Sequence, residues 1–485
     1  MSATAFARAT ARAARPRRNE PRRDARAGAR ARSRASRRAR ASSASVSRTT
    51  VETEKPSTST RADDDATAAL AVKTPHSGYH RQRGVARAFF EGWYFRFTLP
   101  RARESVSLIY HVYDPDLPDS KRAGAGAQVC APGGKYLYAV TGADAFEGAS
   151  HALELKATRA GDEFFEVSRE GTRHRGSLTS AGEDEDGPWG CGRAAKTVRW
   201  DIAVTPLRGW GGGPGARMVS PAGWMTALPV FEPHWQVTMA HGLASGWIET
   251  DGDRVEFTDC PAYSEKNWGG AGFPLKWFWT QCNSFADYPD LSITATGGNR
   301  GVVVLPNVRE DVGLIGVHFG DRFFQFAPLD QLKVASESKY GAGQVLEAAA
   351  VRWDVEWGSW SVAAVGKRFE ILIEGTCTNE DKSTVVRAPT DSLEDGMAPL
   401  CRETFTGNIV VSLWQLNESG ERVEAIIDAA TCSTACLEIG GGPWISPYRA
   451  KAEVRTPLGP LMGLPVDVGA VAKILSPLGD VLPGL

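Results

Sequence analysis

Residues 261–270, Pro-Ala-Tyr-Ser-Glu-Lys-Asn-Trp-Gly-Gly, are the most informative stretch of this chain for chemistry. Between Tyr263 and Asn267, five residues supply a phenol, a carboxyl group, an ammonium group and a carboxamide. Rings and glycines follow at once, namely Trp268, Gly269, Gly270, Phe273, Trp277, Phe278 and Trp279. A carboxyl group among aromatic rings tends to keep its proton, because the loss of water disfavours the anion. An enzyme needs such an acid when it protonates a base as weak as a carbon–carbon double bond.

The state of the Glu265 carboxyl group depends on where Lys266 points. In an extended segment, successive side chains point to opposite faces. Tyr263, Glu265 and Asn267 then share one face, whereas Lys266 and Trp268 share the other. An ammonium group paired with Glu265 would keep that carboxyl group ionised and make it a poor acid. The alternation directs Lys266 away, which favours a protonated Glu265.

A second carboxyl group, Glu91, lies in the aromatic segment 90–99. Its parity places it on the same face as Trp93, Phe95 and Phe97. A carboxyl group on an apolar face is either buried against a partner or a functional acid. The alternative is that Glu91 lies at the end of the strand and reaches solvent or an arginine.

A histidine with polar neighbours lies in the segment 228–237. Glu232 and His234 fall on one face of an extended chain, and Trp235 falls on the other. Pro233 cannot donate a ladder hydrogen bond, so this point is an edge, a strand start or a bulge. His234 is then either a proton relay oriented by Glu232 or a structural histidine in a polar network.

These groups must be positioned by β-strands, because the sequence shows almost no helical periodicity. Short aromatic and β-branched segments alternate with Gly/Pro punctuation from residue 75 onward. The segments predicted as strands are 89–99, 106–113, 136–140, 164–167, 198–204, 231–239, 246–249, 276–283, 291–296, 314–319, 323–326, 351–365, 369–376, 409–416 and 423–429. This pattern predicts an all-β protein built from antiparallel barrels or sandwiches.

A short internal similarity in the sequence indicates two such barrels in tandem. Glu-Gly-Trp-Tyr-Phe-Arg-Phe at 91–97 is followed much later by Leu-Lys-Trp-Phe-Trp-Thr-Gln at 275–281. Each segment precedes a polar turn and another apolar strand. We therefore expect a first barrel over residues 75–270 and a second over 271–485.

The N-terminal arm differs in composition from the rest of the chain. Residues 1–50 contain 15 arginines, no lysine and two acidic residues. An arm rich in Arg, Ser and Ala lacks the apolar residues for a core, so residues 1–70 are predicted to be a disordered organelle transit peptide and linker. The alternative is a disordered basic tail.

The remainder of the chain has an acidic character. Beyond residue 65 it carries 39 basic and 50 acidic side chains, which argues against a nucleic-acid partner. Since no apolar run reaches about 18 residues, no transmembrane segment is predicted.

The eight cysteines do not show the spacing of a metal site. Cys432 and Cys436 are the only close pair, and no histidine lies near them. The sequence also lacks the HExxH, Walker and GxSxG patterns. We therefore expect neither a metal nor a cofactor, and interpret the thiols as core or incidental.

An ordered series of segments resembles the tocopherol cyclase family of plants and algae from about residue 74 to the C-terminus. The matching segments are PHSGY at 75–79, FFEGWYF at 89–95, GAQ at 126–128, AGW at 222–224, LPVFEPHWQ at 228–236, GWIE at 246–249, YSEKNWGG at 263–270, KWFW at 276–279, LIGVH at 314–318, RAPT at 387–390 and LEIGGGPW at 437–444.

The resemblance implies a plastid enzyme of vitamin E synthesis that is found with lipid bodies called plastoglobules. It implies an intramolecular lyase that closes methyl- and dimethyl-phytylbenzoquinol to chromanols, the tocopherols. Protonation of the prenyl double bond would give a tertiary carbocation, which the neighbouring phenol oxygen attacks. The implied partners are the prenylated quinol and a lipid-body or membrane surface, and no cofactor is required.

The resemblance also implies kinship with lipocalin-like carotenoid hydratases, and hence two lipocalin-like barrels. In those relatives a Tyr-x-acid pair and a His–Trp region transfer the proton. The matching positions here are Tyr263, Glu265, His234 and Trp235, with Glu265 where the relatives have aspartate.

The expected proton donor is Glu265, hydrogen-bonded to Tyr263, with Glu91 as the second candidate acid. His234 is expected to accept or relay the phenol proton, oriented by Glu232. The expected substrate contacts are Trp93, Trp235, Asn267, Trp268 and Trp277.

Two alternatives stay open. A carotenoid or prenyl-lipid hydratase would admit water to the carbocation. A non-catalytic lipocalin-like prenylquinone-binding protein would need aromatic walls but no acid that faces the cavity.

Overall fold

The computed structural model describes residues 74–80, 88–117, 123–159, 162–180, 193–211, 218–223, 226, 232–270, 272–302, 305–328, 343–377, 383–390, 396–441 and 449–455. All of them belong to one compact unit, residues 58–485. The predicted arm and transit peptide, 1–70, lie outside the described residues. Within the described part of the chain, no helix has the length and apolar character to cross a membrane, and no three acidic, histidine or cysteine side chains gather as metal ligands.

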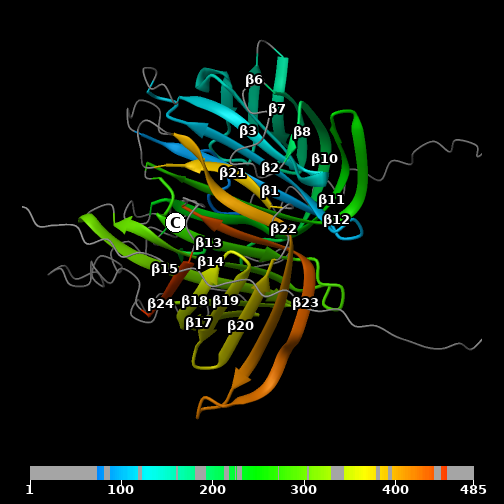
Figure 1. Ribbon diagram of the computed structural model, residues 1–485. Helices are drawn as coiled ribbons and strands as arrows, with labels where there is room; N and C mark the ends of the chain where they lie inside the picture. Colours follow the sequence, from blue (N-terminus) through cyan, green and yellow to red (C-terminus); the bar gives the residue numbers. More distant parts are fainter. Residues whose placement is uncertain are drawn as a thin grey trace, which may run out of the picture. The chain divides into compact units, whose positions relative to one another are not determined.

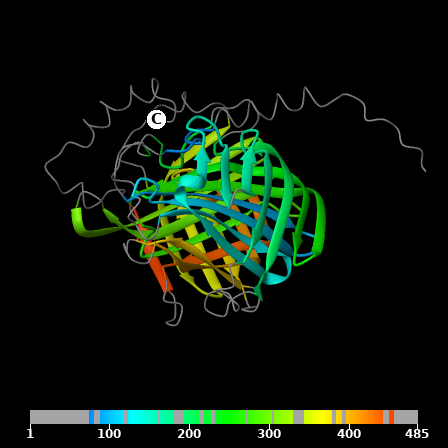
Figure 2. The same cartoon turned by 90° about the horizontal axis from the view of Figure 1, so that it is seen from above.

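The first sheet contains twelve strands in the order β5-β6-β7-β8-β10-β11-β12-β1-β2-β3-β4-β9 (Figure 1). Seen from above, its strands curl round one side of the molecule (Figure 2). Their bounds are β1 Phe90–Leu99, β2 Glu104–Tyr113, β3 Gly124–Ala131, β4 Lys135–Thr141, β5 Phe146–Gly148, β6 Leu155–Arg159, β7 Asp162–Ser168, β8 Arg173–Thr179, β9 Arg193–Ala194, β10 Thr197–Arg208, β11 His234–Thr250 and β12 Asp253–Gly269. Two short 3-10 turns, η1 Pro132–Gly134 and η2 Ala143–Ala145, flank β4.

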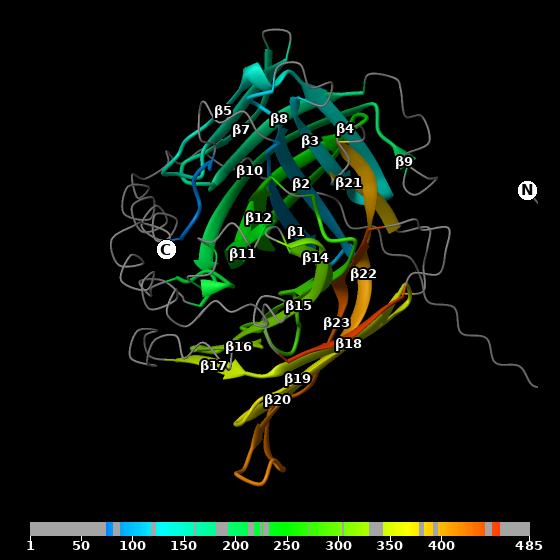
Figure 3. The ribbon, with the colours of Figure 1, turned by 90° about the vertical axis from the view of Figure 1, so that its left-hand side faces the viewer.

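The second sheet also contains twelve strands, in the order β17-β16-β15-β14-β13-β23-β22-β20-β19-β18-β24, with β21 paired to β22. It lies next to β1, β11 and β12 of the first sheet (Figure 3). The bounds are β13 Lys276–Cys282, β14 Ser292–Val302, β15 Leu305–Phe319, β16 Arg322–Ala327, β17 Gln344–Ala348, β18 Ala350–Glu356, β19 Ser359–Val365, β20 Phe369–Thr376, β21 Ser383–Pro389, β22 Met397–Leu416, β23 Arg422–Gly440 and β24 Arg449–Val454.

Each sheet encloses its own apolar core, and a third apolar layer joins the two sheets. The first core includes Trp93, Phe95 and Phe97, and the second includes Phe278 and Trp353. The joining layer contains side chains of both sheets, among them Val237, Tyr263, Trp277, Trp279, Phe405 and Cys436. Strands β1, β11 and β12 are therefore covered on both faces.

Strand β1 shows how a strand with two buried faces is built. Its odd-numbered rings enter the first core, whereas Arg96 faces the joining layer and is fully buried. The guanidinium group donates to the Gln281 side-chain oxygen at 2.6 Å, to the Ser105 hydroxyl oxygen at 3.1 and 3.2 Å and to the Thr434 carbonyl at 2.5 Å. A buried charge is tolerated only when its donors are satisfied in this way.

The sequence-based fold prediction of an all-β protein is confirmed, with two curled sheets in tandem. The prediction of antiparallel pairing holds for most strands, but β4–β9 and β16–β17 are parallel. Of the three possibilities for Pro233, the structure shows a strand start, because β11 begins at the next residue.

Candidate active site

Strand β12 separates the polar groups of the segment 263–268 onto two faces. Glu265 pairs in register with Tyr94, and Lys266 pairs with Trp93. Glu265 therefore faces the joining layer with Tyr263, and Lys266 faces the interior of the first sheet. The alternation predicted for this segment is confirmed.

Glu265 lies among donors that carry no charge. Its side chain is 9% exposed, and the Tyr263 hydroxyl donates to Oε2 at 2.7 Å. Burial raises the pKa of Glu265 to about 7, although the Tyr263, Trp235 and Trp279 side chains favour the anion. The charge of Glu438 adds to the increase. Near neutral pH this carboxyl group is therefore substantially protonated, as a general acid requires.

A cavity of about 240 Å³ lies against the Glu265 carboxyl group. Indoles supply much of its wall, namely Trp235, Trp277 and Trp279. On β14 and β15 the wall includes Gly297 and Gly313, where a Cβ atom would come within 3.1 and 2.6 Å of the Trp353 ring. Glycine is needed at both positions because the rings of Trp353 and, behind Gly297, Phe278 fill the space behind the wall. An apolar cavity with a few convergent polar groups is the usual form of a small-molecule site.

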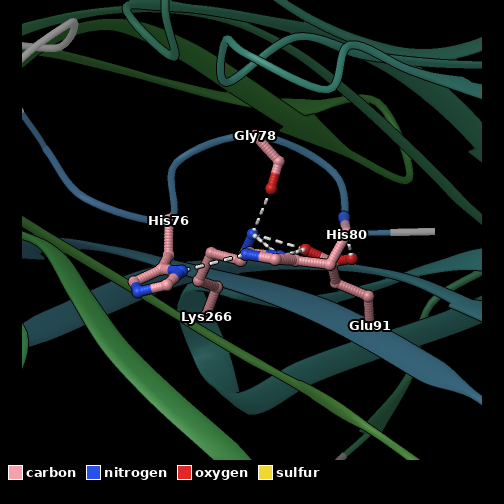
Figure 4. Close-up of polar contacts among 5 residues, drawn as sticks. All are labelled: His76, Gly78, His80, Glu91 and Lys266. Atoms are coloured by element: carbon pink, nitrogen blue, oxygen red, sulfur yellow. Dashed lines mark hydrogen bonds and ion pairs between the residues drawn. The ribbon is translucent and has the colours of Figure 1, made fainter. Parts of the chain in front are cut away.

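Behind β12, Lys266 forms a buried ion pair with Glu91 (Figure 4). Both side chains are fully buried, and Lys266 Nζ also donates to the Gly78 carbonyl at 2.6 Å. The His80 amide donates to Glu91 Oε2 at 2.8 Å. Burial alone would raise the pKa of Glu91, but the charge of Lys266 and the contact with His80 bring it below its usual value. Glu91, the second candidate acid, is thus ionised and lies on the far side of the sheet from Glu265.

His234 and Glu232 lie at the start of β11. His234 belongs to the cavity lining, but its ring stacks on Trp268 with the centroids 5.0 Å apart. In register it pairs with Trp268, while Trp235 pairs with Asn267. Its ring is therefore on the face opposite to Glu265. Glu232 is buried and accepts the Gly270 amide at 2.7 Å.

The five predicted substrate contacts divide between the two faces. Trp235, Asn267 and Trp277 line the cavity. Trp93 lies in the first core, and Trp268 stacks on His80 with 4.2 Å between centroids. The structure brings three of the five to the cavity and places Trp93 and Trp268 beside the Lys266–Glu91 pair, where both rings lie within cation–π range of the ammonium group.

Sequence reasoning did not single out two other carboxyl groups of the joining layer. Glu438 on β23 lines the same cavity as Glu265. Glu403 on β22 pairs directly with Glu438 in register and is fully buried. For Glu438 a signal was available, since it is the one charged residue of the apolar segment Cys-Leu-Glu-Ile-Gly at 436–440. Glu403 follows Arg402 directly, so its sequence neighbours gave no such signal.

Weak donors surround Glu403. The Cys130 thiol lies 3.4 Å from Oε1, and the Tyr94 hydroxyl and Cys436 thiol lie 3.5 and 3.8 Å from Oε2. Burial, together with the charge of Glu438, raises the pKa of Glu403 to about 8. Burial also raises the pKa of Glu438, and hydrogen bonds from Trp277 and Cys401 oppose that increase.

Comparison with known proteins shows the family of this chain. A family model described as Tocopherol cyclase-like matches residues 87–441. The chain is 35% identical over 436 residues to the chloroplastic tocopherol cyclase of Zea mays, covering 83% of this chain and 85% of that protein. It is equally identical to a probable chloroplastic tocopherol cyclase of Oryza sativa subsp. japonica, with 83% and 86% covered. The solved structure of CghA aligns with a TM-score of 0.39 and 8% identity over 73% of this chain and 90% of that chain, a likeness too low to support any argument. The chain belongs to the tocopherol cyclase family.

Proposed function

We propose that this protein closes a phytylated methyl- or dimethyl-benzoquinol to a chromanol by protonating its prenyl double bond. The observation that carries the proposal is a carboxyl group, Glu265, buried beside a cavity walled by indoles. The names of the relatives in maize and rice support the same activity, and also a chloroplast location. Association with plastoglobules follows from the lipid character of the substrate and is part of the proposal.

The reaction makes three demands, and features of the cavity correspond to the first two. The donor must hold its proton near neutral pH, and burial raises the pKa of Glu265 to about 7. The tertiary carbocation needs aromatic faces, and each favourable cation–π contact is worth about 0.5–2 kcal/mol. The faces of Trp235, Trp277 and Trp279 are available for this role. The phenol oxygen must be held near the cation, which makes its capture intramolecular.

The role of Tyr263 is to orient the acid. Its hydroxyl donates to Oε2, so the proton of Glu265 resides on the other oxygen, Oε1. The phenol itself stays neutral, since burial and the Glu265 carboxyl group raise the pKa of Tyr263 well above its usual value. Tyr263 thus positions Glu265 without exchanging its own proton.

The experiment is incubation of the full-length protein with the reduced quinol, followed by chromatography of the products. We expect chromanol from the wild type, and a loss of at least about a hundredfold in rate for Glu265→Gln. The matched control is Glu256→Gln, the same change on the same strand at a side chain that is 72% exposed. It should retain the wild-type rate.

Product identity separates the proposal from its alternatives. Recovery of a tertiary alcohol in place of chromanol would identify a hydratase. Binding of the quinol without turnover would identify a carrier, and Glu265→Gln with wild-type turnover would remove that residue from the mechanism.

A further inference from the structure

We propose that Glu438 is the catalytic base of this cavity, and that it takes the phenol proton of the quinol as the chromanol ring closes. Glu403 would be its positioning partner, a carboxylic acid that keeps its proton and leaves the negative charge on Glu438. This inference rests on the proposed cyclase function and extends it to the second proton transfer.

The first observation is that the cavity has a carboxyl group on each of its two sheets. Glu265 comes from β12 and Glu438 from β23, and both line the cavity. The charge of Glu438 acts on Glu265, so the two groups lie within electrostatic reach of each other. A bound quinol would therefore lie between an acid from one sheet and a carboxylate from the other.

The second observation is the hydrogen bond from Trp277 to Glu438. The Trp277 indole nitrogen donates to Glu438 Oε1 at 2.6 Å. An indole N–H is a donor only, so it favours the ionised carboxylate. The indole lies directly over Gly440, where a Cβ atom would come within 1.6 Å of the Trp277 ring, so only glycine leaves room for it. The fold thus holds two donors, the Trp277 indole and the Cys401 thiol, against Glu438.

The third observation is the pairing of Glu403 with Glu438 across β22 and β23. Residues directly opposite in an antiparallel pair have Cβ atoms about 5 Å apart. Two carboxylates at that spacing do not both ionise in a buried site, so the pair holds one proton. Glu403 faces thiols and a phenol, whereas Glu438 receives the indole N–H. The geometry therefore assigns the proton to Glu403 and the charge to Glu438.

Arg96 does not neutralise this pair. Its N–H groups donate to Gln281, Ser105 and the Thr434 carbonyl. Its charge reaches Glu403 and lowers the pKa of that group, but less than burial raises it. Glu438 can thus keep a negative charge that also stabilises the carbocation.

The reaction then balances without a net change in protons. The π electrons of the alkene take the proton of Glu265, forming a C–H bond and a tertiary carbocation and leaving Glu265 ionised. A lone pair of the phenol oxygen forms the C–O bond, and the O–H proton passes to Glu438. Transfer of that proton from Glu438 to Glu265 across the cavity restores both groups.

The test is turnover in deuterium oxide by Glu438→Gln and Glu265→Gln, read by mass spectrometry. Wild type should give chromanol with one deuterium on carbon. Glu438→Gln should lose at least about a hundredfold in chromanol formation and still place deuterium on the prenyl chain, as isomerised alkene or tertiary alcohol. Glu265→Gln should show neither product nor deuterium on carbon.

Two further variants keep the test decisive if Glu438→Gln folds poorly. Glu438→Asp retains a carboxylate and should recover part of the chromanol rate. Trp277→Phe removes the indole donor, and we expect about a tenfold loss of chromanol with deuteration retained, the effect of one hydrogen bond to a charged group.

Some outcomes would overturn the inference and leave the proposed function intact. These are chromanol formation by Glu438→Gln within about threefold of wild type, or loss of deuteration in Glu438→Gln to the level of Glu265→Gln. A wild-type protein that makes no chromanol would instead contradict the proposed function itself.

Discussion

Glu91 on β1 and Glu265 on β12 are two buried carboxyl groups that lie on opposite faces of the first sheet. They are in opposite protonation states. On one face, Glu91 meets the ammonium group of Lys266 and the amide of His80. On the other, Glu265 meets a phenol, indoles and the charge of Glu438. Burial disfavours both anions, so burial does not distinguish them. The two groups differ in their charged neighbours, because Glu91 lies beside the Lys266 ammonium group and Glu265 lies near the Glu438 carboxylate.

Consecutive residues of β12 contribute to different properties, since Lys266 takes part in a buried ion pair and Glu265 faces the cavity. The Lys266–Glu91 pair holds the segment 76–80 through Gly78 and His80 and does not line the cavity. The adjacent residue, Glu265, is left without a cation, and this gives it a proton to donate. Because the two residues are consecutive, a change of register by one residue would exchange their environments.

The largest expected effect comes from Lys266→Met, which breaks the ion pair and leaves Glu91 buried without its cation. Such a loss typically costs about 3–5 kcal/mol in the free energy of unfolding. Chemical denaturation should show it. The control is Lys156→Met at an exposed position of β6, with an expected change below about 0.5 kcal/mol. Equal stabilities of the two variants would mean that the ion pair contributes nothing.

The next largest effect is on the pH dependence of the free energy of unfolding, to which Glu265 and Glu91 contribute with opposite signs. The pKa of Glu265 is raised from 4.5 to about 7, so its contribution is complete below pH 4.5 and is lost as the pH rises through 7. Relative to Glu265→Gln, wild type should lose about 3 kcal/mol over this range. The pKa of Glu91 is lowered, so its contribution is present at higher pH and is lost in acid below 4.5. Denaturation across the pH range checks both signs, and a Glu265→Gln difference that is flat with pH would contradict the account.

The smallest effect is expected from Tyr263→Phe. Removing the hydroxyl that donates to Glu265 should raise the pKa of the acid by about one further unit and cost about 1 kcal/mol of stability. The alkaline limb of the rate profile should move up accordingly. Tyr136→Phe, which also loses a 2.7 Å buried hydrogen bond, should lose similar stability without moving the profile.

The alternation of side chains along a strand made much of the site predictable. It placed Tyr263, Glu265 and Asn267 together and Lys266 away from them, and the structure agrees. It could not show which face of the strand meets the cavity. For that reason Trp93, which shares a face with Glu91, was expected as a cavity wall and lies in the first core instead.

The second carboxyl pair was beyond local sequence reasoning. Glu438 reaches the cavity, and Glu403 reaches Glu438, only because β13 pairs with β23 and β23 pairs with β22. Pairing between strands that are far apart in the sequence depends on the register of the whole sheet. The alternation of side chains within one strand does not determine that register. His234 lines the cavity and its ring lies against Trp268, and its role in proton transfer stays a prediction.

The most direct test of the central claim is an infrared titration of the full-length protein, taken as the difference between wild type and Glu265→Gln. We expect a C=O stretch of a protonated carboxylic acid that is present in wild type, absent in the variant, and lost as the pH rises through about 7. A difference spectrum that shows only a carboxylate band down to pH 4.5 would mean that Glu265 is ionised at working pH. Glu265 would then be unable to donate the proton, and the proposed mechanism would be wrong.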